Sequence, residues 1–239
     1  MSVAFEVVSV IGITVTGLSF PVLAQQYNPP DWGLPGRREG GGTRGCWVNQ
    51  SDRTSDIPLT ALVPSRNVGY TSAAYPSFFV YVPQFYAEQA AGAEFLLSDA
   101  EGNEVYVATF QTNANAGIVR LNLPDTGNLP PLELGKTYRW SFSLICDMDD
   151  RSADLVVESW VERTELSPQL AATVQNATAS QLPSIYAEAG IWYDALNSLA
   201  ELPYQPGNLV PASQWTNLLH SVELDHIARD IPIESVELR

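Results

Sequence analysis

The strongest constraint on the fold is a series of short segments, rich in Val, Phe, Tyr and Trp, that recur with turn residues between them. Such segments are typical of β-strands. The turn from Glu101 to Glu104, with Gly102 and Asn103 at its centre, predicts a hairpin. The predicted strands are 59–63, 77–82, 93–99, 104–111, 117–123, 136–146 and 153–163.

Segment 136–146 alternates most regularly between two faces. One face carries Tyr138, Trp140, Phe142, Leu144 and Cys146, and the other carries Arg139, Ser141 and Ser143. Trp140 and Cys146 therefore point into one core, as a Trp does beside the disulfide of immunoglobulin domains. We predict a mainly β fold for residues 59–165, an immunoglobulin-like antiparallel β-sandwich.

A helical pattern follows. Apolar residues recur at intervals of three and four over 184–202, which predicts a helix that begins at Ser184 and ends before Pro203. A second helix is predicted over 212–220. Two such helices cannot bury a core of their own. We therefore expect residues 166–239 to form a helical segment packed on the sandwich, which gives an α+β fold.

The N-terminal residues 1–24 have the pattern of a signal peptide. An apolar run over 7–18 is too short to span a bilayer, and small residues precede Gln25, where cleavage is expected. The first six residues contain Glu6 and no Lys or Arg, which departs from the usual basic start. The alternative is a buried N-terminal strand. Export predicts a periplasmic or extracellular protein with no membrane insertion after cleavage.

Cys46 and Cys146 are the two cysteines of the chain. In an oxidising compartment they can form one disulfide. The alternative is two separate buried thiols. A metal site is disfavoured because neither His220 nor His226 has ligand spacing to a cysteine.

The charge of the chain excludes one class of partner. It carries 27 Asp and Glu residues against 12 Lys and Arg, for a formal net charge of -15. Binding to phosphate backbones relies on clustered basic residues, so nucleic acid is excluded as a partner.

The arm, residues 25–58, is rich in Gly and Pro and holds the locally basic stretch of the chain. Three consecutive glycines follow Arg37 and Arg38, and Arg44 comes shortly after. Two interpretations stand: the arginines pair with carboxylates of the body, or they bind an anionic ligand. The candidate ligand or partner contacts are Trp32, Arg37, Arg38 and Arg44.

Catalytic signals are weak, and we predict no catalytic residue, cofactor or metal. No Gly-x-Ser-x-Gly nucleophile motif occurs. Four carboxylates follow strand 136–146 and predict either a solvated turn or a calcium site. They are Asp147, Asp149, Asp150 and Asp154. We predict that Trp160 is a core residue, because the helices need a face of the sheet to pack on; if it faces solvent instead, it could stack on a sugar or contact a partner.

Several stretches resemble one protein family. They are PPDWGLPGRREGGGTRGC (29–46), TALVP (60–64), FFVYVP (78–83), LELGKTYRWSFSLICD (132–147) and IYAEAGIWYDAL (185–196). The chain is similar to an uncharacterised, mostly cyanobacterial family of exported proteins known only as a domain of unknown function. The resemblance implies an envelope or extracellular setting, with Cys46 and Cys146 as the cysteines of the family, and it brings no activity.

Three functions follow as hypotheses. The first is an exported binding or assembly module of the cell envelope, whose partner is an envelope protein or polysaccharide. The second is a polysaccharide-acting enzyme with paired carboxylates. The third is calcium-dependent adhesion through the carboxylates of residues 147–154.

Overall fold

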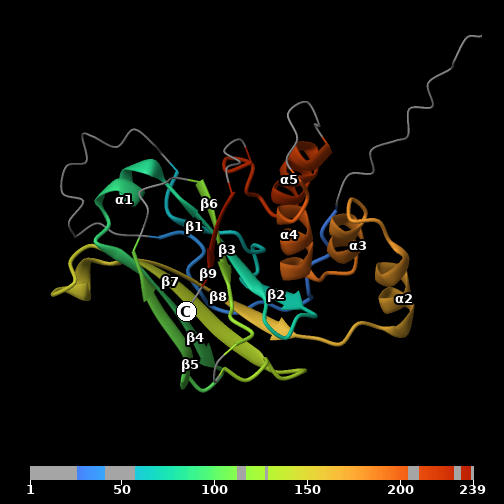
Figure 1. Cartoon of the computed structure of the whole chain (residues 1–239), viewed down its shortest axis with the longest axis horizontal. Coiled ribbons are helices and arrows are strands. Elements are labelled where there is room, and N and C mark those ends of the chain that lie inside the picture. The colour runs from blue at the N-terminus through green and yellow to red at the C-terminus, as the bar shows by residue number, and fades with distance from the viewer. Residues whose placement is uncertain are drawn as a thin grey trace, which may run out of the picture.

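The computed structural model describes residues 26–40, 57–111, 117–126, 129–203, 210–228 and 233–237, the last five and residues 210–211 by their backbone. Two β-sheets pack against each other, and most of the helices gather at one end of them (Figure 1). The predicted signal peptide, 1–24, lies outside the described residues.

The larger sheet has the order β2-β8-β7-β4-β5. Its strands are β2 (Val68–Thr71), β4 (Gly92–Asp99), β5 (Glu104–Phe110), β7 (Thr137–Ile145) and β8 (Leu155–Arg163). All its pairs are antiparallel except β2 with β8. The predicted hairpin is present between β4 and β5, where Gly102 has a φ of 89° that favours glycine.

The smaller sheet has the order β1-β3-β6-β9. Its strands are β1 (Thr60–Ala61), β3 (Ser77–Val82), β6 (Gly117–Asn122) and β9 (Ile233–Glu237). β6 and β9 are parallel. The mainly β fold with two sheets and helices is confirmed, whereas β2, β9 and the two parallel pairings were not predicted.

Aromatic side chains fill the space between the sheets. The ring of Phe78 on β3 lies 5.0 Å from Phe95 and 5.1 Å from Trp140, centroid to centroid. The next residue, Phe79, points the other way and lies 6.3 Å from Trp215 of a covering helix. β3 is therefore buried on both faces, which explains why its sequence is apolar without alternation.

The helices are α1 (Gln84–Gln89), α2 (Pro168–Asn176), α3 (Leu182–Glu188), α4 (Trp192–Ala200) and α5 (Val210–His220). The prediction of one helix over 184–202 is wrong, because the chain breaks at Gly190, which has a φ of 77°. A Cβ there would lie 2.7 Å from the carbonyl oxygen of Asn28. The break lets Tyr193 of α4 reach the core, where its ring lies 5.4 Å from Phe78.

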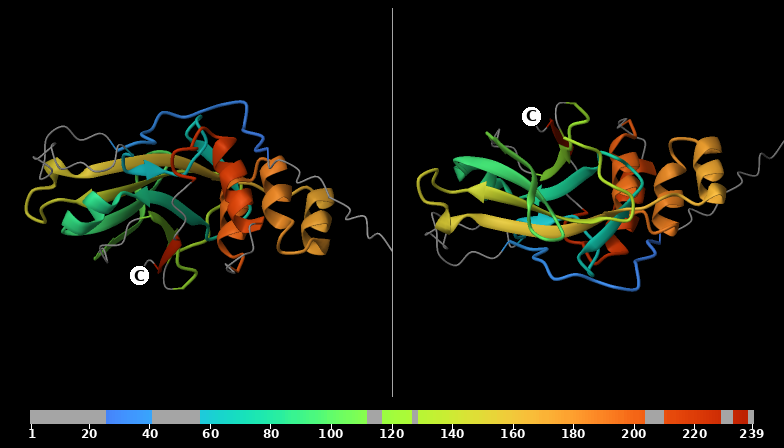
Figure 2. Two further views of the ribbon diagram at one scale, coloured as in Figure 1. Left: turned by 90° about the horizontal axis from the view of Figure 1, so that it is seen from above. Right: turned by 90° about the horizontal axis from the view of Figure 1, so that it is seen from below.

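The described part of the arm, 26–40, runs along one side of the molecule from the helices to the sheets (Figure 2). Main-chain hydrogen bonds hold it. The N–H of Arg37 donates to the carbonyl of Glu158 on β8 at 3.1 Å, and the N–H of Glu158 donates back at 2.8 Å. Near the helices, the N–H of Asn28 donates to the carbonyl of Ala187 at 3.1 Å.

Candidate functional site

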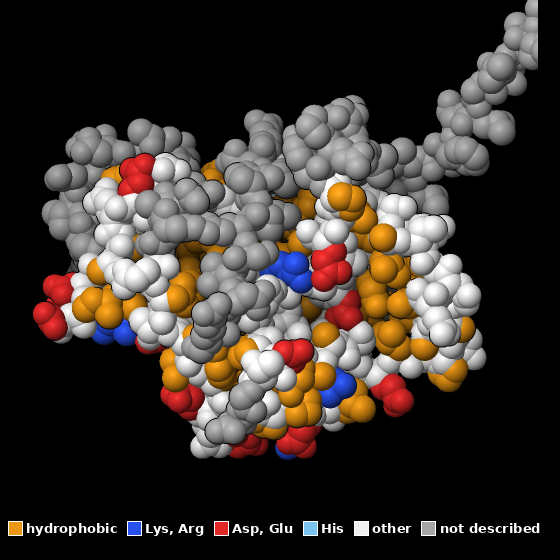
Figure 3. Space-filling view, in the orientation of Figure 1, with side chains coloured by type: hydrophobic (Ala, Val, Ile, Leu, Met, Phe, Trp, Pro, Cys, Tyr) orange, Lys and Arg blue, Asp and Glu red, His pale blue; other side chains and the backbone are white. Residues whose placement is uncertain are grey.

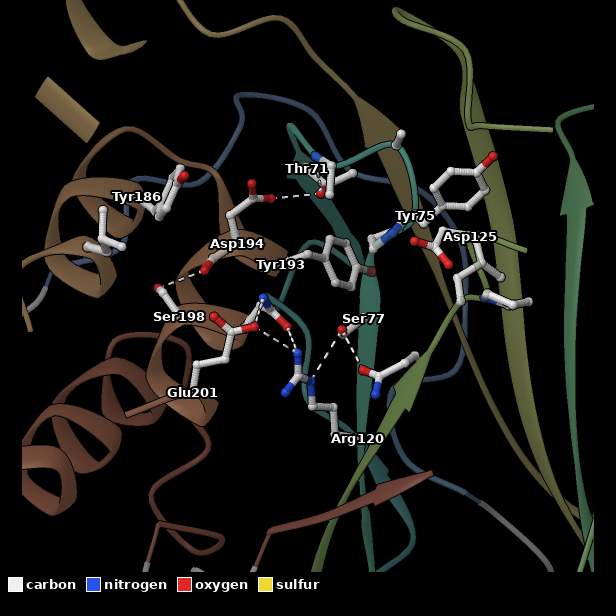
Figure 4. A pocket seen from close by; sticks show the side chains of 18 of the residues that line it. Thr71, Tyr75, Ser77, Arg120, Asp125, Tyr186, Tyr193, Asp194, Ser198 and Glu201 are labelled. Atoms are coloured by element: carbon white, nitrogen blue, oxygen red, sulfur yellow. Dashed lines mark hydrogen bonds and ion pairs between the residues drawn. The ribbon is translucent and has the colours of Figure 1, made fainter. Parts of the chain in front are cut away.

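A cleft of about 850 Å³ opens between the strands and helices α3 and α4. One wall consists of the C-terminal end of β2, the loop 72–76 and parts of β3 and β6; the other consists of α3 and α4 (Figure 4). Its volume lies within the usual range of ligand pockets, roughly 300–1,000 Å³. The side chains that matter most for its chemistry are Tyr75, Arg120, Asp125, Tyr186, Asp194 and Glu201.

Asp194 joins the two walls of the cleft. It lies in the first turn of α4, and its carboxylate accepts hydrogen bonds from Thr71 Oγ1 at 2.7 Å and from the N–H of Ser72 at 3.0 Å. The hydroxyl of Ser72 donates to its second oxygen. Burial raises the pKa of Asp194, although these donors act in the opposite direction. Asp194 therefore holds the helix against the end of β2.

Arg120 makes a second connection between the walls. The Arg120 side chain extends from β6 toward α4. There its Nη2 donates to Oδ1 of Asn197 and, at 3.1 Å, to Oε1 of Glu201. Its Nε donates to the hydroxyl of Ser77 at 3.3 Å, and that hydroxyl donates to Oδ1 of Asn122 at 2.8 Å. The Arg120 side chain is 16% exposed, so the guanidinium serves mainly these internal contacts.

Tyr193 lies between the walls, deep in the cleft (Figure 4). Its hydroxyl accepts from Trp140 Nε1 at 2.8 Å and donates to the carbonyl of Trp160 at 3.0 Å. Burial raises its pKa. The hydroxyl therefore stays protonated and ties α4 to both β7 and β8.

The cleft also has polar groups that form no hydrogen bond with any described residue. They include the hydroxyl of Tyr186 on α3 and the exposed carboxylate of Asp125 after β6. Tyr75 lies on the strand side with Asp125, and Tyr186 lies on the helical side (Figure 4). Unused polar groups beside aromatic rings are what a ligand site offers.

The predicted contact residues lie elsewhere. Trp32 is 37% exposed, and its Nε1 donates to the hydroxyl of Tyr70 at 3.0 Å. Arg38 Nη2 donates to the carbonyl of Val222 at 2.6 Å, and burial lowers its pKa. Arg37 bonds through its backbone. Trp32, Arg37 and Arg38 do not line the cleft, and Arg44 is outside the described residues.

The expectation that arm arginines pair with body carboxylates is not met by the described ones. Neither Arg37 nor Arg38 forms an ion pair with a described carboxylate. The buried Nε of Arg38 has no hydrogen-bond partner among the residues that the structure describes. The arm is attached mainly by backbone and aromatic contacts.

The position of Trp160 differs from the one predicted. It projects from the outer face of β8, and its Nε1 donates to the carbonyl of Pro35 at 2.7 Å. The arm, and not a helix, covers it. The prediction that helices make it a core residue is wrong because they pack at the end of the larger sheet and on the smaller one.

The carboxylates after β7 are engaged locally. Asp147 accepts from the N–H of Asp149 at 2.9 Å, Asp150 accepts from the N–H of Ser152 at 3.0 Å, and Asp154 pairs with Arg151. Among the described residues, no group of three or more His, Cys, Asp or Glu side chains is placed to hold a metal ion. These contacts have the form of a turn.

The predicted disulfide cannot be placed, because Cys46 lies outside the described residues. Cys146 follows β7 and packs partly buried against the core. Its N–H donates to Oδ1 of Asp154 at 3.2 Å. The pairing of Cys46 with Cys146 stays a prediction.

The histidines lie at the far end of α5 and after it. His220 is exposed, and its Nδ1 bonds to Oδ1 of Asp225. His226 is exposed as well. Neither lines the cleft.

The residues of the cleft were not predicted from the sequence. Their one local signal is Asp194, an acidic residue inside the apolar run from Ile191 to Leu196. A carboxylate within such a run has to find hydrogen-bond donors when the helix is buried.

In the part of the chain that the structure describes, no helix has the length and apolar character needed to cross a membrane.

Comparison with known proteins identifies the family of the chain. No curated protein matches the sequence. The profile of one family, described as Domain of Unknown Function (DUF928), matches residues 39–231, most of the chain. The chain therefore belongs to the DUF928 family, a domain of unknown function.

Proposed function

We propose that the protein is a non-enzymatic binding module of the cell envelope and that the cleft beside α3 and α4 is its ligand site. The observation that carries the proposal is the state of the cleft carboxylates. Both oxygens of Asp194 accept hydrogen bonds from Ser72, and Glu201 pairs with Arg120. Only Asp125 has no such partner among the described residues.

This arrangement favours binding over catalysis. A glycosidase needs two carboxyl groups, one that donates a proton as an acid and one that acts as a base or nucleophile. Here Asp194 joins the walls through Thr71 and Ser72, and Glu201 is paired with Arg120, so the cleft has the form of a rigid site with fixed polar groups. Rigid, preorganised sites lose little free energy to ordering when a ligand binds.

Between the two partner classes, polysaccharide fits the cleft better than an envelope protein. A concave site with aromatic rings and polar groups suits one or a few sugar units. Assembly with a protein would favour a broad apolar surface. The exposed large apolar side chains among the described residues are few: Trp32, Val107, Leu134 and Met148.

The setting is part of the proposal. The apolar leader, the small residues before Gln25 and the two cysteines support an exported protein, periplasmic or extracellular, like the mostly cyanobacterial family it resembles. The finer description of the fold as immunoglobulin-like is also a proposal. Its support is the facing sheets and the buried Trp140 on β7.

Affinity electrophoresis through gels that contain envelope polysaccharide tests the function. The mature protein should be retarded, and Ala74→Trp, which fills the rim of the cleft, should run unretarded. Val107→Trp, on exposed β5 away from the cleft, is the matched control and should behave like wild type. Equal retardation of all three proteins would overturn the cleft as the site.

The same samples distinguish binding from hydrolysis. A binding module releases no new reducing ends from the polysaccharide. Release that disappears in Asp125→Asn would establish the enzyme hypothesis in place of ours.

A further inference from the structure

The polar groups that the cleft leaves unused are mainly hydrogen-bond acceptors. Asp125 presents a carboxylate, and Glu201, whose side chain is 60% exposed, uses Oε1 for both Arg120 and Asn197. Its Oε2 has no hydrogen bond to any residue that the structure describes. A carboxylate can only accept, so the complementary ligand is one that donates.

Tyr186 adds a group that both donates and accepts. Its side chain is half-buried on α3, and its hydroxyl forms no hydrogen bond with a described residue. A sugar hydroxyl also donates and accepts, so the two match. Tyr rings combine an apolar face with a polar end, which suits the C–H and O–H surfaces of a sugar ring.

The fixed charges of the cleft disfavour anions. Asp125 and Glu201 together outnumber Arg120, whose Nε and Nη2 already bond to Ser77, Asn197 and Glu201. The rest of the chain, with a net charge of -15, adds to the negative potential. Figure 3 shows the molecule in the orientation of Figure 1, and acidic side chains are spread over the described part of that face with few basic ones among them. A bound anion would be repelled, and Arg120, which already pairs with Glu201, is the one basic side chain that it would meet among the described residues of the cleft.

We propose that the cleft recognises a hydroxyl-rich sugar unit that is neutral or carries an amino group, and that it rejects acidic sugars. The inference rests on the proposed function of the cleft. The donor-rich ligand would bond to Asp125 and Glu201, and the rings of Tyr75 and Tyr186 would contact its apolar faces.

Titration calorimetry of the full mature protein with three sugar trimers tests this. The trimers of glucose, glucosamine and glucuronic acid, all with the same linkage, share one backbone and differ in charge. We expect the glucosamine trimer to bind tightest, by about tenfold or more over the glucuronic acid trimer, because each unscreened charge contact changes affinity by that order. Added salt should weaken the glucosamine trimer and leave the glucose trimer unchanged.

Substitutions of the two carboxylates test whether Asp125 and Glu201 cause the preference for the glucosamine trimer. Asp125→Asn with Glu201→Gln should reduce the preference for the amino trimer to about threefold or less, since the acceptors stay and the charges go. Val107→Trp should leave all three affinities unchanged.

Two results separate this inference from the function beneath it. If the acidic trimer binds as tightly as the others and Ala74→Trp abolishes that binding, the sugar preference is overturned and the cleft stands as a binding site. If none of the trimers binds, the inference is overturned, and the polysaccharide gel then decides the function by itself.

Discussion

The arm and the cleft both join segments that are far apart in the sequence, but they do so with different groups. The arm uses its backbone: Arg37 and Glu158 exchange main-chain hydrogen bonds, and Gly36 packs against Asn67. The cleft uses side chains, chiefly Asp194 and Arg120. Backbone contacts tolerate most side-chain substitutions, so the arm depends on its glycines, whereas the cleft depends on its polar residues.

The largest expected effect concerns the attachment of the arm to the body. If Cys46 and Cys146 form a disulfide, Cys46→Ser should lower the free energy of unfolding by ~2–4 kcal/mol. Chemical denaturation measures this free energy. Intact-mass analysis should show that the mature protein begins at Gln25 and contains no free thiol. An unchanged midpoint would show that the disulfide is absent or contributes nothing to stability.

Gly36→Ala should be next in size. A Cβ at residue 36 would lie 1.5 Å from the side-chain amide of Asn67 and 3.0 Å from the carbonyl oxygen of Glu158. Asn67 is buried, so it has little room to move. Overpacking of this kind costs about 2–3 kcal/mol, which denaturation of the variant measures. A loss under about 0.5 kcal/mol would show that the arm shifts freely and is not a fixed part of the fold.

Asp194→Ala should destabilise the cleft by about 2 kcal/mol, because it leaves the donors of Thr71 and Ser72 without an acceptor. Thermal or chemical denaturation gives the value. A neutral result would mean that water replaces the carboxylate and that the two walls are joined mainly by packing.

The contribution of Asp194 to the free energy of unfolding should also depend on pH. Burial raises its pKa, so just above the ordinary pKa of Asp the folded protein holds a proton that the unfolded chain lacks. The contribution of Asp194 to the free energy of unfolding therefore increases as the pH falls through its raised pKa. The free-energy difference between wild type and Asp194→Asn should grow in favour of wild type from pH about 7 to about 4.5. Denaturation at both pH values measures it, and a constant difference would contradict the shift.

Arg37→Ala should have the smallest effect, within about 0.5 kcal/mol of wild type, because an exposed side chain is removed and the backbone bonds stay. It is the matched control for Gly36→Ala in the same segment. A larger loss would mean that the charge of Arg37 also holds the arm.

The strands of the two sheets were predictable where their signal is local. Alternation over residues 136–146 and the turn at Gly102 depend on neighbouring residues, and both features are present. β2 and β9 were missed because they are short and each pairs with a strand far away in the sequence. The break at Gly190 was missed because its cause, the close approach of Asn28, is tertiary.

The cleft was not predictable for the same reason. Its residues come from three distant parts of the chain: Thr71, then Arg120 and Asp125, then Tyr186 and Asp194. The basic arm drew attention through its composition, yet its described arginines act through the backbone or through a carbonyl partner. Unusual composition can therefore mark a structural segment as easily as a ligand site.

The pairing of β6 with β9 also limits when the protein can fold. β6 ends at residue 122, and its parallel neighbour begins at residue 233, close to the C-terminus. The smaller sheet cannot be completed until β9 has been synthesised. Non-local strand pairing of this kind slows folding and leaves edges exposed in the meantime. A growing chain therefore lacks this strand pair until residues 233–237 have been made and have returned to β6.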